Sequence, residues 1–160
     1  MTETAPRPFI EVMAKHLPPS ASTLRLADVN AAAGAVLLEL RPDMEPVSVY
    51  GADWMMDENS ADAVTAYGTG LIAGLLRAAL WALRPGGRLI VVDPHGAPDH
   101  RQVETLEAAG YTRILVEAAL REPLQGVLMR GEKPHTTADT LARVSAVAQR
   151  DAAATDLAGF

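Results

Sequence analysis

The sequence predicts an α/β fold: a doubly wound, mostly parallel sheet of about six strands with an antiparallel edge. Segments with helical periodicity alternate with short strand-like segments, which is the pattern of βαβ units. The run GRLIVVD at 87–93 is continuously apolar, as expected of a strand that helices cover on both faces. The last two expected strands, at 111–119 and 124–132, are separated by a turn at Glu122-Pro123 and can pair antiparallel.

The first half of the chain supplies two helices and three strands. Apolar residues recur at helical spacing over 9–17, and a Pro-Pro pair ends that helix. An alanine- and leucine-rich helix is expected over 31–41, ending at Pro42. The three strands share alternating or β-branched composition and are expected at 23–29, 46–53 and 61–68.

The second half is expected to contain three more helices. The strongly apolar segment 71–84 predicts a largely buried helix, and Gly86-Gly87 lies just past its end, where a left-handed residue is needed. An amphipathic helix is predicted over 99–110, with Gly110 at its end. An alanine-rich segment with a narrow apolar stripe predicts a final helix over 138–160.

Length and composition indicate one domain over 1–160, with an N-terminal helix within 1–20 and a C-terminal helical extension over 138–160. Apolar residues make up 49% of the chain, an ordinary globular value. The net charge is −6 and no basic cluster occurs, so we expect no nucleic-acid binding. Cysteine is absent, the N-terminus does not resemble a signal peptide, and no apolar run is long enough to span a membrane. These features predict a cytoplasmic protein that does not bind membranes.

Three stretches resemble the class I S-adenosylmethionine-dependent methyltransferases. They are LRPGGRLIVVD at 83–93, NSADAVTAYG at 59–68 and LEAAGYTRILVE at 106–117. The resemblance extends over about residues 57–133 and, less closely, over 24–41. It implies a Rossmann-like methyltransferase fold and S-adenosylmethionine as the cofactor.

In that family, the cofactor loop follows the first strand as an acidic residue and then Gly-x-Gly-x-Gly. Asp28 falls at the acidic position, whereas Asn30, Ala32 and Gly34 fall at the three glycine positions. Asn tolerates a positive φ well, but the methyl group of Ala32 would lie in the path of the cofactor or at a costly backbone angle. We therefore expect a weakened loop. Asp28 would hold the amino group of the cofactor or cap the following helix.

The segment between the first helix and the family's fourth strand is too short for the family pattern. Residues 43–60 have room for one strand, so about one strand–helix unit is missing. Asp53 can therefore close the second strand as the ribose-binding acid, or the same strand can be the third, which contacts the adenine ring. Trp54, with Met55 and Met56, would form an apolar wall for the adenine or a partner; core packing or a lid is the alternative.

Candidate substrate-side residues end the next two strands. Tyr67 follows the expected strand at 61–68, with a packed aromatic as the alternative. Asp93 and His95, with His100, would serve as a general base or a metal site, or form a solvated turn. Their spacing matches no metal motif, so we predict no metal. His16 and His135 are expected at the surface.

These features predict a degenerate methyltransferase-like protein, a pseudoenzyme that acts as a binding or interaction module for a protein partner or as a homodimer. One alternative is an active small-molecule methyltransferase that uses S-adenosylmethionine. Another is a structural subunit of a homo-oligomer, in which the helix at 138–160 docks on a second copy.

Overall fold

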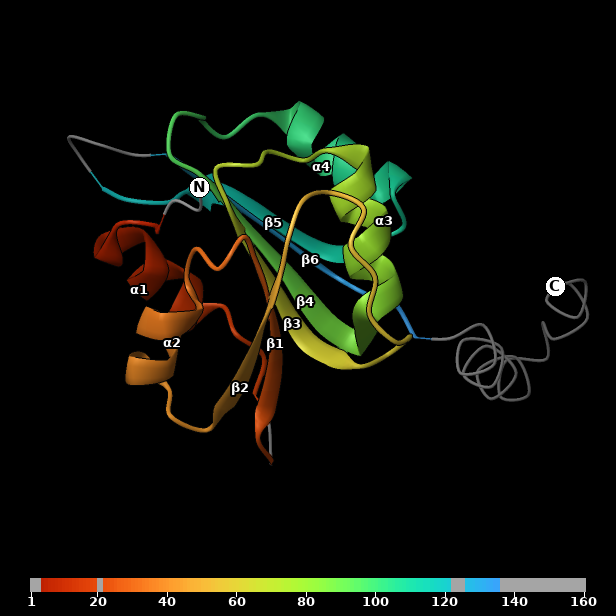
Figure 1. Ribbon diagram of the computed structural model, residues 1–160. Coiled ribbons are helices and arrows are strands. Elements are labelled where there is room, and N and C mark those ends of the chain that lie inside the picture. The colour runs from red at the N-terminus through yellow and green to blue at the C-terminus, as the bar shows by residue number, and fades with distance from the viewer. Residues whose placement is uncertain (1–3, 20–21, 122–125, 136–160) are drawn as a thin grey trace, which may run out of the picture.

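The computed structural model describes residues 4–19, 22–121 and 126–135 (Figure 1). The helix predicted over 138–160 and the turn at Glu122-Pro123 lie outside these residues. The elements are, in chain order, α1 (Arg7–Lys15), β1 (Leu24–Val29), α2 (Gly34–Leu40), β2 (Met44–Val49), β3 (Ala61–Tyr67), α3 (Ala73–Ala82), β4 (Leu83–Asp93), α4 (His100–Ala108), β5 (Thr112–Ala118) and β6 (Val127–Glu132).

The predicted doubly wound sheet is confirmed. Its six strands have the order β2-β1-β3-β4-β6-β5. The first four in chain order pair in parallel, and β6 runs antiparallel between β4 and β5. Helices α1 and α2 cover one face, and α3 and α4 cover the other (Figure 1). Of the described residues, none forms a helix that is long and apolar enough to cross a bilayer.

Each face of the sheet has its own apolar core. Along β4, Leu89 and Val91 point to the α3 side, whereas Ile90 and Val92 point to the α1 side, as the two-residue period of a strand requires. All four are fully buried, which explains why the segment reads as a continuous apolar run.

The Gly86-Gly87 pair, expected just past the end of the buried helix, lies in a bulge inside β4. The helix α3 ends at Ala82, and Leu83 already pairs with Ala61 in the sheet. The next pair joins Ala63 to Arg88, so the Arg-Pro-Gly-Gly segment loops out between the two pairs. Gly86 is left-handed, with φ +83°, as expected, but it serves this bulge and does not cap the helix.

Among the residues that the structure describes, no strand takes the third place of the doubly wound order. That order places the second strand beside the first and the third outside the second. β2 pairs directly with β1, so it takes the place of the second strand and forms an edge of the sheet. The loop 50–60 then runs alongside α3 and leads into β3 (Figure 1).

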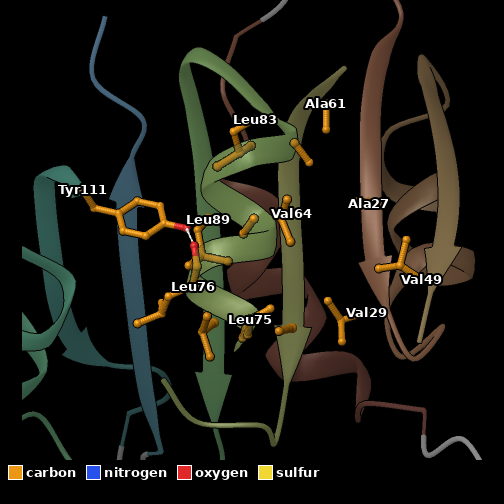
Figure 2. Packing of buried hydrophobic residues seen from close by; sticks show 14 of the residues in the cluster. Ala27, Val29, Val49, Ala61, Val64, Leu75, Leu76, Leu83, Leu89 and Tyr111 are labelled. Carbon is orange, nitrogen blue, oxygen red and sulfur yellow. Dashed lines mark hydrogen bonds between the residues drawn. The ribbon is translucent and has the colours of Figure 1, made fainter. Parts of the chain in front are cut away.

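Tyr111 joins the start of β5 to α3. Its hydroxyl donates a hydrogen bond of 2.8 Å to the Leu76 carbonyl, across the core shown in Figure 2. The ring is 3% exposed, and burial raises the pKa of the phenol well above its ordinary value. A Cβ on Gly131 of β6 would lie 2.9 Å from the Tyr111 Cβ, so the ring also requires a glycine opposite it.

Candidate functional site

The carboxyl ends of β1, β2, β3 and β4 meet at one edge of the sheet, where α/β folds bind ligands. Asp28, near the end of β1, is 2% exposed. Its carboxylate accepts hydrogen bonds from the amides of Ala33 (3.2 Å) and Gly34 (2.7 Å) and from the hydroxyl of Thr65 on β3 (3.3 Å). Asp28 therefore ties the start of α2 to the neighbouring strand.

Burial and hydrogen bonding act on the Asp28 carboxyl in opposite directions. Burial raises its pKa above the ordinary value because it penalises the charged form. The bonds from Gly34, Ala33 and Thr65 lower the pKa, and burial is the larger effect. The carboxylate is thus held in place by donors whose removal would leave it buried and unpaired.

The left-handed residues of the loop after β1 are Asn30 (φ 60°) and Ala31 (φ 54°). The expectation of a strained φ at Ala32 is therefore wrong, because the turn is made one residue earlier. Asn30 suits this conformation, but Ala31 carries its Cβ at a cost of about 1 kcal/mol. Ala32 itself is 2% exposed.

Every backbone N–H from residue 30 to residue 34 has an acceptor within the chain. Asn30 donates to the Val49 carbonyl at the end of β2. The amides of Ala31 and Ala32 donate to the carbonyls of Asp28 and Val29, and the next two amides donate to the Asp28 carboxylate. On the outer side, the Ala5 amide donates to the Ala32 carbonyl at 2.8 Å.

Gly34 is the glycine that the loop shares with the methyltransferase pattern, and its environment explains it. A Cβ at this position would lie 2.8 Å from Oδ2 of Asp28 and 3.3 Å from the Cβ of Pro46. The space that a side chain would need is already taken by the chain itself. Gly34 thus accommodates Asp28.

The predicted strand 46–53 is too long at its carboxyl end, because β2 stops at Val49. Gly51 is left-handed (φ +79°), and its amide donates to Oδ1 of Asn30 at 3.2 Å, which turns the chain away from the sheet. Asp53 therefore lies in the loop 50–60 and is exposed. Because β2 takes the second place in the sheet, the alternative in which it is the third strand is excluded.

Trp54 lies inside the core on the α3 side of the sheet, and 8% of its surface is exposed. It belongs to the same apolar cluster as Val29 and Val49, the last residues of β1 and β2, and Met56 packs against that cluster. Met55 is 80% exposed. The Trp54 Nε1 atom is buried and has no hydrogen-bond partner among the described residues.

The substrate-side candidates lie at the ends of β3 and β4. Tyr67 is half-buried, and its ring packs against Phe9 of α1 with 5.7 Å between the centroids. The Asp93 carboxylate accepts a bond of 3.0 Å from the amide of exposed His95. Over the described part of the chain, no three His, Cys, Asp or Glu side chains are grouped to hold a metal ion.

A half-buried charged cluster under α1 was not predicted from the sequence. The ring of His16 is 14% exposed, so the expectation of a surface residue is wrong. Arg130 donates to its Nδ1 at 3.1 Å, and its Nε2 lies 3.4 Å from Glu117. The His16 carbonyl accepts a bond from Arg88. Burial, and then the charge of Arg130, lowers the pKa of His16.

No protein-family model matches the chain, and no curated protein does. Solved structures are similar to it at low identity. One belongs to a Haloferax volcanii complex of a methyltransferase with the Trm112 methyltransferase activator: 15% identity, TM-score 0.59, covering 80% of this chain and 90% of that one. A second is an S-adenosylmethionine-dependent O-methyltransferase of Thermotoga maritima: 15%, TM-score 0.60, covering 85% and 68%.

A third is phosphoethanolamine N-methyltransferase 2 of Haemonchus contortus, solved with phosphomonomethylethanolamine and S-adenosylhomocysteine. The identity is 12% and the TM-score 0.63, over 84% of this chain and 54% of that one. The chain thus spans about half of that enzyme. These likenesses agree with the alternation of helices and strands and with the mixed sheet in indicating one fold. The chain has the Rossmann-like fold of the class I S-adenosylmethionine-dependent methyltransferases.

Proposed function

We propose that the chain is a degenerate S-adenosylmethionine-dependent methyltransferase-like protein that acts as a non-catalytic binding module. One observation carries the proposal: all five N–H groups from 30 to 34 are bonded within the chain. A loop that binds the charged end of a cofactor must offer free N–H groups toward it. This loop has none to offer without breaking an existing bond.

The neighbouring residues support the same reading, because they fit a nucleoside cofactor poorly. The clearance at Gly34 is filled by the Asp28 carboxylate, and Ala31 carries a methyl group at a left-handed φ. The Ala5 amide bonds to the outer side of the loop, and Trp54 is buried in the same cluster as the ends of β1 and β2. These residues therefore do not fit S-adenosylmethionine as a catalytic cofactor.

An active small-molecule methyltransferase is the second candidate, and one observation favours it. Trp54 is 8% exposed, and its indole N–H has no acceptor among the described residues. A buried donor without an acceptor costs about 1–3 kcal/mol, and a bound ligand with an acceptor atom would relieve that cost. In that case the affinity for the cofactor would depend on the indole N–H.

Calorimetric titration of the full chain with S-adenosylmethionine and S-adenosylhomocysteine separates the two candidates. The binding module predicts no saturable heat at millimolar ligand. Binding at low micromolar ligand, weakened in Trp54→Phe, would overturn it in favour of the enzyme. The Trp54→Phe variant keeps a buried aromatic ring but removes the indole N–H together with part of the ring, so it tests the indole as a whole.

A further inference from the structure

A groove lies between β2 and the loop 50–60, at the edge of the sheet that β2 forms among the described residues. It has a volume of about 430 Å³, and the lining that matters consists of Arg25, Glu45, Val47, Met56, Asp57 and Ser60. A second cavity of about 400 Å³ shares Arg25, Glu45 and Ser60 with it and continues it past the amino ends of the strands. We call this continuous surface the β2 groove.

Exposed apolar side chains lie in the β2 groove and in the loop beside it. The described residues include seven large apolar side chains that are exposed, and five of them lie between residues 38 and 55. Val47 is 48% exposed within the groove, and Tyr50 (60%) and Met55 (80%) follow in the adjoining loop. Leu38 and Leu40 belong to α2, which covers the other face of the sheet, so they lie outside the groove. Clustered exposed apolar side chains mark interaction sites.

The carboxylates of Glu45 and Asp57 line the groove, and the segment that contains them is acidic. Residues 38–58 contain six carboxylates and one arginine, a net charge of −5, whereas the whole chain carries −6. All six carboxylate residues are exposed. Glu45, Asp53 and Asp57 form no salt bridge with any described residue. Two cations line the groove: Arg25, which borders both cavities, and Arg84, which pairs with Asp62 in the second.

We infer that the β2 groove binds a short segment of another protein that carries apolar side chains together with lysine or arginine. This inference rests on the proposed function of the chain as a binding module and names its partner. Apolar side chains of the partner would cover Val47 and Met56, and its cations would face Glu45 and Asp57. A second copy is disfavoured because two such acidic surfaces repel, and nucleic acids and anionic membranes are disfavoured for the same reason.

The backbone of β2 explains why side chains would carry this binding. The carbonyls of Asp43 and Val49 accept hydrogen bonds from residues of the β1 segment. The backbone N–H and C=O groups of the odd-numbered residues of β2 therefore point toward β1, and those of the even-numbered residues point away from it. Pro46 therefore stands at an outward position and offers no N–H to an added strand. Pro46 therefore disfavours the addition of a strand from another chain at this edge. The side chains of the groove would then determine which partner binds.

The test uses the full chain and a fluorescein-labelled peptide of alternating lysine and valine, followed by fluorescence anisotropy. We expect saturable binding that Glu45→Lys/Asp57→Lys weakens by about tenfold. The matched control, Glu104→Lys/Glu107→Lys on exposed α4, makes the same change in net charge and should weaken binding far less. Val47→Ser should also weaken it, whereas Ile72→Ser, at a site 44% exposed on the start of α3, should not.

Three results would overturn the inference. The first is absence of saturation at millimolar peptide, and the second is equal weakening by the groove variant and its control. The third is evidence for another occupant of the groove. That evidence would be tighter binding of a labelled single-stranded oligonucleotide, or self-association in analytical ultracentrifugation that Glu45→Lys/Asp57→Lys abolishes. Binding of S-adenosylmethionine in the calorimetric titration would instead overturn the proposed function and leave the groove result standing.

Discussion

Oδ2 of Asp28 accepts the Gly34 amide at 2.7 Å, and a Cβ on Gly34 would lie 2.8 Å from the same oxygen. One carboxylate therefore holds the start of α2 and also dictates the glycine. The residue pair that marks the chain as methyltransferase-like is explained by a contact inside the chain.

The first prediction concerns this pair. Gly34→Ala forces the new methyl group against Asp28, and such overpacking costs about 1–3 kcal/mol of unfolding free energy. Asp28→Ala leaves two amides unsatisfied and costs about 1–3 kcal/mol as well. In the double variant the clash with the carboxylate is gone. Its loss of unfolding free energy should therefore be smaller than the sum of the losses in the two single variants. Urea unfolding of the four proteins measures this coupling.

Asp28→Asn is the matched control for the carboxylate. Its oxygen can accept from the Gly34 and Ala33 amides while its NH₂ group donates to the Thr65 hydroxyl, so most of the stability should be retained. Strict additivity of Asp28→Ala and Gly34→Ala would contradict the contact.

The second prediction concerns the loop 50–60. Trp54→Ala removes a ring that is 8% exposed and should cost about 3–5 kcal/mol, as for other large core aromatics. Met55→Ala, next to it in the chain and 80% exposed, should change stability by less than about 0.5 kcal/mol. Chemical denaturation measures both. Similar effects of the two substitutions would show that the loop does not contribute to the core.

The third prediction concerns the hydrogen bond between Tyr111 and the Leu76 carbonyl. Tyr111→Phe keeps the ring and removes a buried bond, which should cost about 0.5–1.5 kcal/mol. Tyr50→Phe provides the control, because that side chain is 60% exposed. Thermal unfolding should show a lower midpoint for Tyr111→Phe alone. An unchanged midpoint would count against the bond.

The fourth prediction is a pH dependence that comes from His16. Arginine can only donate, so the bond from Arg130 requires an unprotonated Nδ1 and leaves the proton on Nε2, toward Glu117. The folded-state pKa lies below the ordinary value of 6.5. The contribution of His16 to stability is therefore fully present above about pH 6.5 and is lost as the pH falls through the folded-state pKa.

Urea unfolding at about pH 7.5 and about pH 5 measures this loss. His16→Gln can still accept from Arg130 and donate to Glu117, and it should lose less stability on acidification than the unmodified chain. His100→Gln serves as the control, because the His100 side chain is 82% exposed. A pH dependence that His100→Gln and His16→Gln alter equally would rule out His16 as the source.

The sequence predicted what depends on local patterns. The periodicity of Phe9, Ile10 and Met13 and the apolar run at 87–93 located α1 and the buried part of β4. What it missed depends on residues that are distant in the chain. His16 is hydrogen-bonded to Arg130, 114 positions away in the chain, and no local pattern predicts such a contact.

The candidate site shows the same division. The position of Asp28 at the end of the first strand could be read from the sequence, whereas the partners of its carboxylate could not. Thr65 is a polar residue within an apolar strand, and that irregularity was the available signal. The left-handed turn falls at Ala31 because the amides of residues 33 and 34 must reach the Asp28 carboxylate, a constraint of geometry that composition does not reveal.

The most direct test of the account follows the amide resonances of residues 30–34 by ¹H–¹⁵N NMR while S-adenosylhomocysteine is added. The internal hydrogen bonds predict that these five resonances stay in place at millimolar ligand. Saturable shifts of the Gly34 and Ala33 amides at low micromolar ligand would contradict the account, because the loop would then be a working cofactor site.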